Sequence, residues 1–198
     1  MIKGAETHDR ILGAAVRLVS RGGLDGLSIG ALADELHLSK SGLFAHFGSK
    51  DELRLQTLQA AVDRFANVVM RPALGAPRGE ARVRALFRNW LLWGNDEALP
   101  GGCPLIVAAV ELDDQPGPER DFLFQAQRDW MAALSRAVRL SIEVGDFKRG
   151  LDTEQFAFEL YGIILGYNHA RRLLHDMKAE RRARAAFERL VRDARRER

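Results

Sequence analysis

The stretch that decides the fold runs from Ser28 to Leu53 and reads SIGALADELHLSKSGLFAHFGSKDEL. Ser28 and Ser39 each precede a short amphipathic run, and a serine in that place can cap a helix by accepting a hydrogen bond from its first turn. Gly48 ends the second run, because glycine readily adopts the left-handed conformation in which helices often end. The pattern therefore predicts a helix, a short turn and a second helix, an arrangement that can place its second helix in the major groove of DNA.

The second helix of this stretch offers an outward face suited to nucleic acid. If Leu43 and Phe47 face the core, the opposite face carries small, hydroxyl, cationic and aromatic side chains, namely Lys40, Ser41, Phe44 and Ala45. Such a face can approach base edges closely. Backbone amides and positive charge at a helix N-terminus also attract phosphate, which favours the same role for Ser39 and, at the start of the next helix, for Lys50.

Helical periodicity continues on both sides of this stretch, and no convincing strand alternation appears. An amphipathic helix is expected before it, and a capping-box pattern from Ser49 to Glu52 opens a long helix to about Met70 after it. The clearest break is Pro72 to Gly79. The expected helices outside the deciding stretch cover residues 7–21, 51–70, 80–94, 104–112, 118–144, 153–176 and 180–195.

The fold class that follows is all-α. We expect an N-terminal three-helix helix-turn-helix domain at residues 1–50, and a C-terminal helical domain for effector binding and dimerisation at residues 51–198. Residues 51–70 would form the helix that connects them.

Composition is ordinary for a soluble globular protein, with 198 residues, 46% hydrophobic and 29% charged. No segment reaches the roughly 18 apolar residues that span a bilayer, and the N-terminus is not of signal-peptide type, so we expect a cytoplasmic protein without membrane contact. The single cysteine, Cys103, excludes an intrachain disulfide framework, and we interpret it as a small buried hydrophobe rather than an oxidant sensor. The arginine-rich segment 171–198 is interpreted as a solvated helix face rather than a polyanion-binding tail.

No pattern for catalysis is present. The sequence lacks a glycine-rich phosphate loop, a nucleophile motif and a metal-binding His-Glu pattern. His169, His175 and Asp176 come nearest to a metal cluster, but their spacing does not fit adjacent turns of one helix. We therefore expect no enzymatic activity, no cofactor and no metal.

Aromatic side chains gather in the C-terminal part, where they can line an apolar pocket or simply fill the core. The candidate ligand-binding residues are Phe65, Phe87, Trp90, Trp130 and Tyr161. The expected helix 153–176 is apolar on two faces, one with Phe156 and Leu160 and the other with Phe158 and Leu165, so it must be covered on two sides. The second cover is most simply another subunit, packed as an intersubunit four-helix bundle with 118–144. The candidate dimer-interface residues are Leu134, Leu160, Ile164 and Tyr167.

The segment GLFAHFGSKDEL, from Gly42 to Leu53, resembles the DNA-binding signature of the TetR family, which follows the pattern Gly-Leu-aromatic-x-His-Phe-x-Ser-Lys-x-x-Leu. The similarity covers roughly residues 8–55. Phe44 departs from it, because the family most often has tyrosine there, and a phenol hydroxyl that could donate to phosphate is missing. Carried over by position, the resemblance implies these DNA-side residues: Ser28, Ser39, Lys40, Ser41, Phe44, His46 and Lys50.

The resemblance also implies a homodimer that reads a palindromic operator in double-stranded DNA. A small-molecule effector, expected to be largely apolar, would bind the C-terminal domain, shift the connecting helix and release a repressor. Two alternatives stay open. An architectural DNA-binding protein would bind DNA without responding to small molecules, and a helical enzyme or small-molecule carrier would not bind DNA sequence-specifically.

Overall fold

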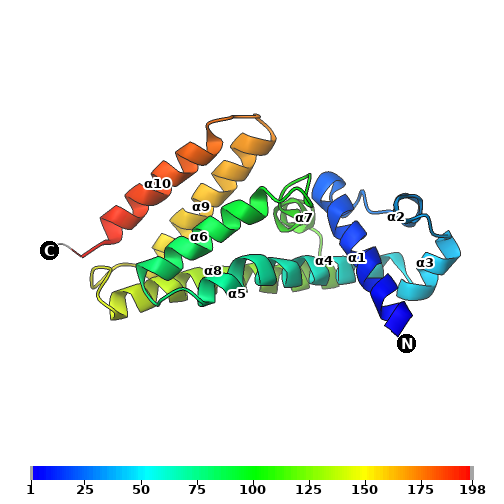
Figure 1. Cartoon of the computed structure of the whole chain (residues 1–198), viewed down its shortest axis with the longest axis horizontal. Coiled ribbons are helices and arrows are strands. Elements are labelled where there is room, and N and C mark those ends of the chain that lie inside the picture. The colour runs from blue at the N-terminus through cyan, green and yellow to red at the C-terminus, as the bar shows by residue number, and fades with distance from the viewer. Residues whose placement is uncertain (1, 197–198) are drawn as a thin grey trace. The chain divides into compact units, whose positions relative to one another are not determined.

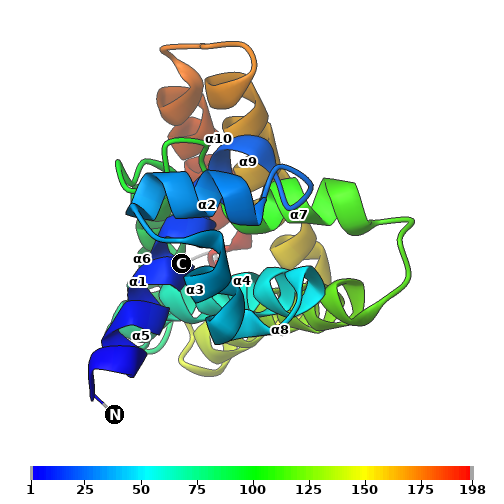
Figure 2. The ribbon, with the colours of Figure 1, turned by 90° about the vertical axis from the view of Figure 1, so that its right-hand side faces the viewer.

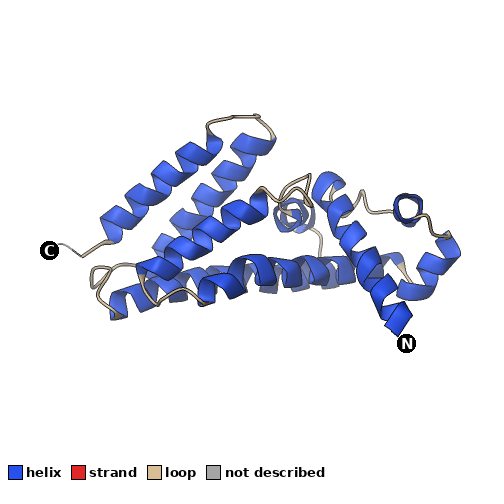
Figure 3. Ribbon diagram, in the orientation of Figure 1, coloured by secondary structure: helices blue, strands red, loops and turns tan. Residues whose placement is uncertain are grey.

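The computed structural model describes residues 2–196, with side chains from Glu6 onward. Within this range all regular structure is helical, apart from an isolated bridge between Phe147 and Arg195 (Figure 1, Figure 3). The all-α prediction is thereby confirmed. The elements are α1 Ile2–Gly22, α2 Ile29–Leu36, α3 Lys40–Phe47, α4 Lys50–Phe65, η1 Ala66–Met70, α5 Arg71–Leu74, α6 Glu80–Gly94, α7 Pro104–Leu112, α8 Pro118–Glu143, α9 Thr153–Arg172 and α10 Ala179–Ala194.

Packing divides the chain into two compact units. The first unit contains Met1–Arg64 and Asn95–Gln125, and the second unit contains Phe65–Gly94 and Ala126–Arg198. These units rest on packing and are not continuous in sequence. The division into functional domains at residues 1–50 and 51–198 stays a prediction.

The first unit is held together where α1 ends. Gly23 has φ +72°, and a β-carbon there would lie 1.8 Å from Glu111 Oε1, so only glycine fits without displacing that carboxylate. Glu111, on α7, accepts a hydrogen bond from the Leu24 amide at 2.6 Å. This contact ties α7 to the end of α1, and α2 and α3 pack in sequence after it.

The second unit has an aromatic and aliphatic core to which α9 contributes one face. Phe156, Leu160, Ile164 and Tyr167 of α9 are buried. Tyr167 meets Trp90 of α6 edge-on, with ring centroids 6.1 Å apart. α10 packs along α9.

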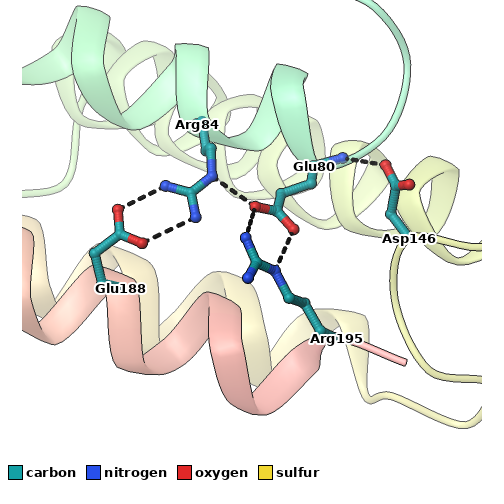
Figure 4. A network of polar contacts seen from close by, with 5 residues as sticks. All are labelled: Glu80, Arg84, Asp146, Glu188 and Arg195. Carbon is teal, nitrogen blue, oxygen red and sulfur yellow. Dashed lines mark hydrogen bonds and ion pairs between the residues drawn. The ribbon is translucent and has the colours of Figure 1, made fainter. Parts of the chain in front are cut away.

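A polar network fastens α10 to the start of α6 (Figure 4). The Glu80 carboxylate accepts hydrogen bonds from Arg195 at 2.8 and 2.6 Å and from Arg84 at 2.6 Å. Arg84 also donates to both oxygens of Glu188, and Asp146 accepts the Glu80 amide at 2.9 Å. Arg195 of the basic C-terminal segment is therefore ion-paired, as are Arg182 with Asp176 and Arg184 with Glu180.

The connecting helix differs from expectation at its far end. Instead of stopping near Met70, the helical backbone continues through η1 and α5 to Leu74, with Pro72 inside it. Pro72 has no N–H for the Val68 carbonyl, and the helix is π-helical directly before it, with the Arg71 amide donating to the Ala66 carbonyl. The break therefore begins after Leu74. Across residues 2–196, no helix is long and apolar enough to cross a membrane.

Candidate functional site

The predicted helix-turn-helix forms α2 and α3, joined by a short turn (Figure 2). Ser28 Oγ accepts the Ala31 amide and Ser39 Oγ accepts the Gly42 amide, each at 3.1 Å. His37 makes the turn with φ 54°, a left-handed conformation that is uncommon outside glycine. Both predicted caps are confirmed, so Ser28 and Ser39 fix the helix starts by local hydrogen bonds.

The outward face of α3 carries the residues that the sequence placed there. Leu43 and Phe47 are buried, whereas Lys40, Ser41 and Ala45 are exposed and Phe44 is 47% exposed. The Ser41 hydroxyl lies 3.3 Å from that of Ser39. The Phe44 ring is therefore outside the core and open to solvent on this face.

The starts of α2 and α3 lie close together at Gly30. A β-carbon on Gly30 would lie 3.8 Å from Lys40 Nζ and 3.9 Å from Ser28 Oγ. Ser28 and Lys40, twelve positions apart in sequence, therefore both lie next to Gly30, which has no side chain to separate them. Gly30 was not among the candidate residues, and a small residue two positions after a cap was the available signal.

His46 and Lys50 occupy the end of α3 and the start of α4. His46 is half-buried, with its ring centroid 6.2 Å from His8 and 6.3 Å from Phe47, so it borders the small core. Lys50 is exposed. Ser49 caps α4 through the Glu52 amide at 3.1 Å. The reciprocal half of the capping box is not made, because the Glu52 carboxylate accepts from Gln56 instead.

The five candidate ligand-binding residues do not form one group. Phe65 and Trp130 lie together with perpendicular rings 5.0 Å apart, and Trp93 adds a second edge contact to Phe65 at 5.6 Å. The other three have separate partners: Phe87 stacks on Phe187 at 4.1 Å, Trp90 meets Tyr167, and Tyr161 donates to Gln127 at 3.1 Å. Among the five, these ring contacts pair only Phe65 with Trp130, so the structure does not bring the candidate residues together into one site.

Trp130 has an unusual polar atom. Its side chain is 5% exposed, and its Nε1–H is buried without a hydrogen-bond partner among the described residues. A buried donor without an acceptor costs roughly 1–3 kcal/mol, so an acceptor placed beside Trp130 Nε1 would be stabilising.

The four candidate dimer-interface residues lie in the core of the single chain. Leu134, Leu160, Ile164 and Tyr167 are between 0% and 4% exposed, so a second subunit cannot reach them. α10 packs along α9 and Trp90 of α6 meets Tyr167, so this face of α9 belongs to the core of the chain and the interface expected on it is corrected. The face left open is the other apolar one, with Phe158 68% and Leu165 38% exposed.

An open groove of about 850 Å³ runs along this face, between α8 and α9. It is lined by apolar residues and by charges of both signs, which include Met131, Phe158, Arg136, Arg139, Glu143 and Glu154. None of the candidate ligand-binding residues lines it.

Two minor candidates can be placed. Cys103 is buried, at 3% exposure. The described residues contain no group of three or more His, Cys, Asp or Glu side chains that could hold a metal ion.

Comparison with known proteins adds the family. The family model described as "Bacterial regulatory proteins, tetR family" matches residues 11–57, and that described as "Tetracyclin repressor-like, C-terminal domain" matches residues 79–187. The curated relative IcaR of Staphylococcus aureus, the negative transcriptional regulator of a biofilm operon, is 31% identical over 62 residues. That match covers 31% of this chain and spans only about a third, 33%, of the length of the relative.

Solved structures share the fold over almost the whole chain. A TetR-family regulator from Cytophaga hutchinsonii has a TM-score of 0.85 at 18% identity, covering 99% of this chain and 98% of that one. AibR, solved in complex with isovaleryl coenzyme A and operator DNA, has a TM-score of 0.74 at 22% identity, covering 93% and 97%. Since one of the two family models alone matches more than half of the sequence, the chain belongs to the TetR family of bacterial regulatory proteins.

Proposed function

We propose that this protein is a sequence-specific DNA-binding transcriptional regulator that represses from a palindromic operator and is released by a small-molecule effector. The outward face of α3 carries this proposal. It joins an exposed cation and hydroxyl, Lys40 and Ser41, to a half-exposed ring, Phe44, at the N-terminus of a capped helix. Because the proposed partner is DNA, we also propose that the protein is cytoplasmic.

The DNA-side residues divide by chemistry into two groups. Lys40, Ser39 and Ser28 gather at the adjoining N-termini of α2 and α3, where amides and positive charge suit phosphate. Ser41, Phe44 and Ala45 lie further along the exposed side of α3, where they would meet base edges in the major groove. Lys50 would add a phosphate contact from α4, and His46 is the weakest member because the small core already borders it.

The relatives support the sign of regulation and the existence of an effector. IcaR is a negative regulator, and AibR was solved with both a small acyl-coenzyme A ligand and operator DNA. By analogy we propose repression relieved by a ligand bound in the second unit. An effector next to Phe65 and Trp130 would be largely apolar and would carry one hydrogen-bond acceptor for Trp130 Nε1.

We further propose a homodimer formed by the open face of α8 and α9. Phe158 and Leu165 supply exposed apolar surface, and open space surrounds Gly162 and Gly166, so a partner helix can approach closely. Arg136 and Arg139 share the groove with Glu143 and Glu154, and such mixed charges can pair with themselves across a two-fold axis. Phe158→Arg should give a monomer by sedimentation at micromolar concentration, while Val110→Arg, at an exposed apolar residue of α7, should leave a dimer. A dimer with both variants would overturn this interface.

The function is tested by selecting bound sequences from a random duplex library with the purified full-length protein. Recovery of a palindrome supports a dimeric regulator, and the recovered duplex then serves as the probe for an effector screen. An architectural protein would bind without enrichment of any sequence, and a small-molecule carrier would not bind even at low salt, where phosphate contacts are strongest. Either result overturns the proposal.

A further inference from the structure

The exposed face of α3 lacks the side chains that most often read DNA bases by paired hydrogen bonds. Arginine or lysine reads guanine in this way, and asparagine or glutamine reads adenine. The segment Lys40–Phe47 contains no arginine, asparagine or glutamine, and Lys40 is its only lysine. Whether this face can read a base by paired hydrogen bonds therefore depends on where Lys40 points.

Lys40 is directed toward α2 rather than along α3. A β-carbon on Gly30, near the start of α2, would lie 3.7 Å from Lys40 Cε and 3.8 Å from its Nζ. The cap hydroxyl of Ser28 would lie 3.9 Å from the same point. An ammonium group beside a hydroxyl and the first amides of a helix is suited to a phosphate group. Lys40 is thereby assigned to the DNA backbone and leaves the bases to other residues.

Three small or apolar residues remain on the exposed face of α3. His46 is half-buried, with its ring centroid 6.2 Å from that of His8, so it borders the small core. Ser41, Phe44 and Ala45 are exposed and are spaced i, i+3 and i+4, which places them on one side of the helix. Base recognition by α3 therefore rests on one hydroxyl and on apolar contact.

Phe44 supplies most of the apolar surface on this side. It is 47% exposed, and the residues beside it, Ser41 and Ala45, are small, so a base can approach the ring closely. In the major groove, the 5-methyl group of thymine is the only methyl group that the four bases present. Burying that methyl group against an aromatic ring is favourable, whereas a polar base edge against the ring would lose its hydrogen bonds to water.

We propose that α3 recognises its operator half-site through a thymine methyl group that packs on Phe44, and not through paired hydrogen bonds to guanine or adenine. This inference rests on the proposed function and adds which chemical feature of the bases the site selects. One position of each half-site should therefore require thymine. Because 5-methylcytosine presents the same methyl group in the major groove, it should substitute for thymine at that position better than cytosine does.

The test removes the methyl group from the DNA. In the duplex selected by the wild type, each thymine of one half-site is replaced in turn by deoxyuridine, which pairs with adenine but lacks the 5-methyl group. At one position, this replacement should weaken binding of the full-length wild type about fourfold, the factor that corresponds to one buried methyl group. A cytosine–guanine pair there should weaken binding at least as much, and methylating that cytosine should recover about fourfold.

Protein variants show whether Phe44 is the residue that contacts the methyl group. Phe44→Ala should weaken binding about tenfold and should bind the thymine and deoxyuridine duplexes equally, as expected when one partner of a contact is already missing. Phe44→Leu keeps an apolar side chain and should keep most of the preference for thymine. Phe124→Ala is the matched control, because Phe124 is 52% exposed and lies outside the helix-turn-helix, and it should keep the full preference.

The outcomes separate this inference from the function on which it rests. A selected palindrome whose affinity is unchanged by every deoxyuridine, or a Phe44→Ala variant that keeps the preference for thymine, overturns the methyl contact alone. A selected half-site without thymine does the same. If Phe44→Ala fails to fold, the deoxyuridine series on the wild type and on Phe44→Leu still decides the question. A wild type that selects no duplex overturns the proposed function and the methyl contact with it.

Discussion

α3 and α9 differ in the sequence distance to the residues that position them: α3 is fixed by its immediate neighbours, and α9 by residues far along the chain. α3 begins with a hydrogen bond between Ser39 and Gly42, three residues apart, and ends with one between Gly48 and Phe44. α9 is oriented by contacts with Gln127 on α8 and Trp90 on α6, which lie 34 and 77 positions away. The exposed face of a helix that is fixed by local hydrogen bonds can be predicted from its own sequence. For a helix that is positioned by distant residues, its own sequence does not show which face is covered.

The largest effect that tests this contrast is expected in the stability of α9. Leu160→Ala removes a fully buried side chain and should lower the free energy of unfolding by about 3 kcal/mol. Phe158→Ala, two residues away on the open face, should change the free energy of unfolding by less than about 1 kcal/mol when the chain is diluted until it is monomeric. Urea unfolding at nanomolar concentration measures both, and equal losses would show that the two faces of α9 are not distinguished by burial.

The next effect concerns the outward face of α3. Lys40→Ala combined with Ser41→Ala should lower operator affinity about 100-fold, because one phosphate contact and one base-side contact are lost together. Unfolding should change little, since both side chains are exposed. Fluorescence anisotropy with the selected duplex measures the affinity.

Lys148→Ala is the matched control for that variant, because it removes the same charge from an exposed loop outside the helix-turn-helix. Its affinity should stay within about twofold of the wild type at physiological salt, where distant charges are screened. A comparable loss in both variants would mean that the protein binds DNA through overall charge, and the outward face of α3 would lose its special role.

The same contrast explains what could be predicted from the sequence. The caps Ser28, Ser39 and Ser49 were predicted because a serine and its amide partner lie within one turn, and all three hydrogen bonds are present. The capping-box pattern also predicted that the Glu52 carboxylate accepts the Ser49 amide. That part was wrong, because the Ser49 amide donates to the Phe47 carbonyl and the Glu52 carboxylate accepts from Gln56.

Where distant packing decides, sequence reasoning could find the alternatives but not choose between them. Both apolar stripes of α9 were recognised, yet the interface residues were taken from the stripe with Leu160 and Ile164, which α6 and α10 cover. Pro72 was interpreted as the start of the break, whereas the helical backbone continues through η1 to Leu74, where Asn89 of α6 donates to the Val69 carbonyl. In both places the deciding atoms belong to a separate segment of the chain.

A smaller effect tests the local side of the contrast. Ser39→Ala removes the cap of α3 and should lower the free energy of unfolding by about 1 kcal/mol. Ser39→Asp keeps an acceptor for the Gly42 amide and should restore most of that stability, while its negative charge should weaken DNA binding. Thermal unfolding and duplex binding, measured side by side, separate the two roles, and a stable Ser39→Ala variant would show that the cap is dispensable.

The smallest effect is expected at the contact between Glu80 and Arg195, which lie 115 positions apart. Hydrogen bonds from Arg195, and then from Arg84, hold the pKa of Glu80 below its ordinary value of 4.5, against a partial burial that raises it. A carboxyl group whose pKa is lowered by folding stabilises the fold above its unfolded pKa, and this stabilisation disappears as the pH falls through the folded value. Glu80→Gln should therefore be less stable than the wild type at pH 7, by less than about 1 kcal/mol because the ion pair is partly exposed.

The pH dependence distinguishes this tie from simple packing. The difference between the wild type and Glu80→Gln should shrink as the pH is lowered below about 4.5, because protonated Glu80 and glutamine then resemble each other. Glu97→Gln, at an exposed glutamate of the first unit, should follow the wild type throughout. If the Glu80→Gln difference stayed constant with pH, the carboxylate would not be held by its arginines, and α10 would depend on the stacked Phe87 and Phe187 for its attachment to α6.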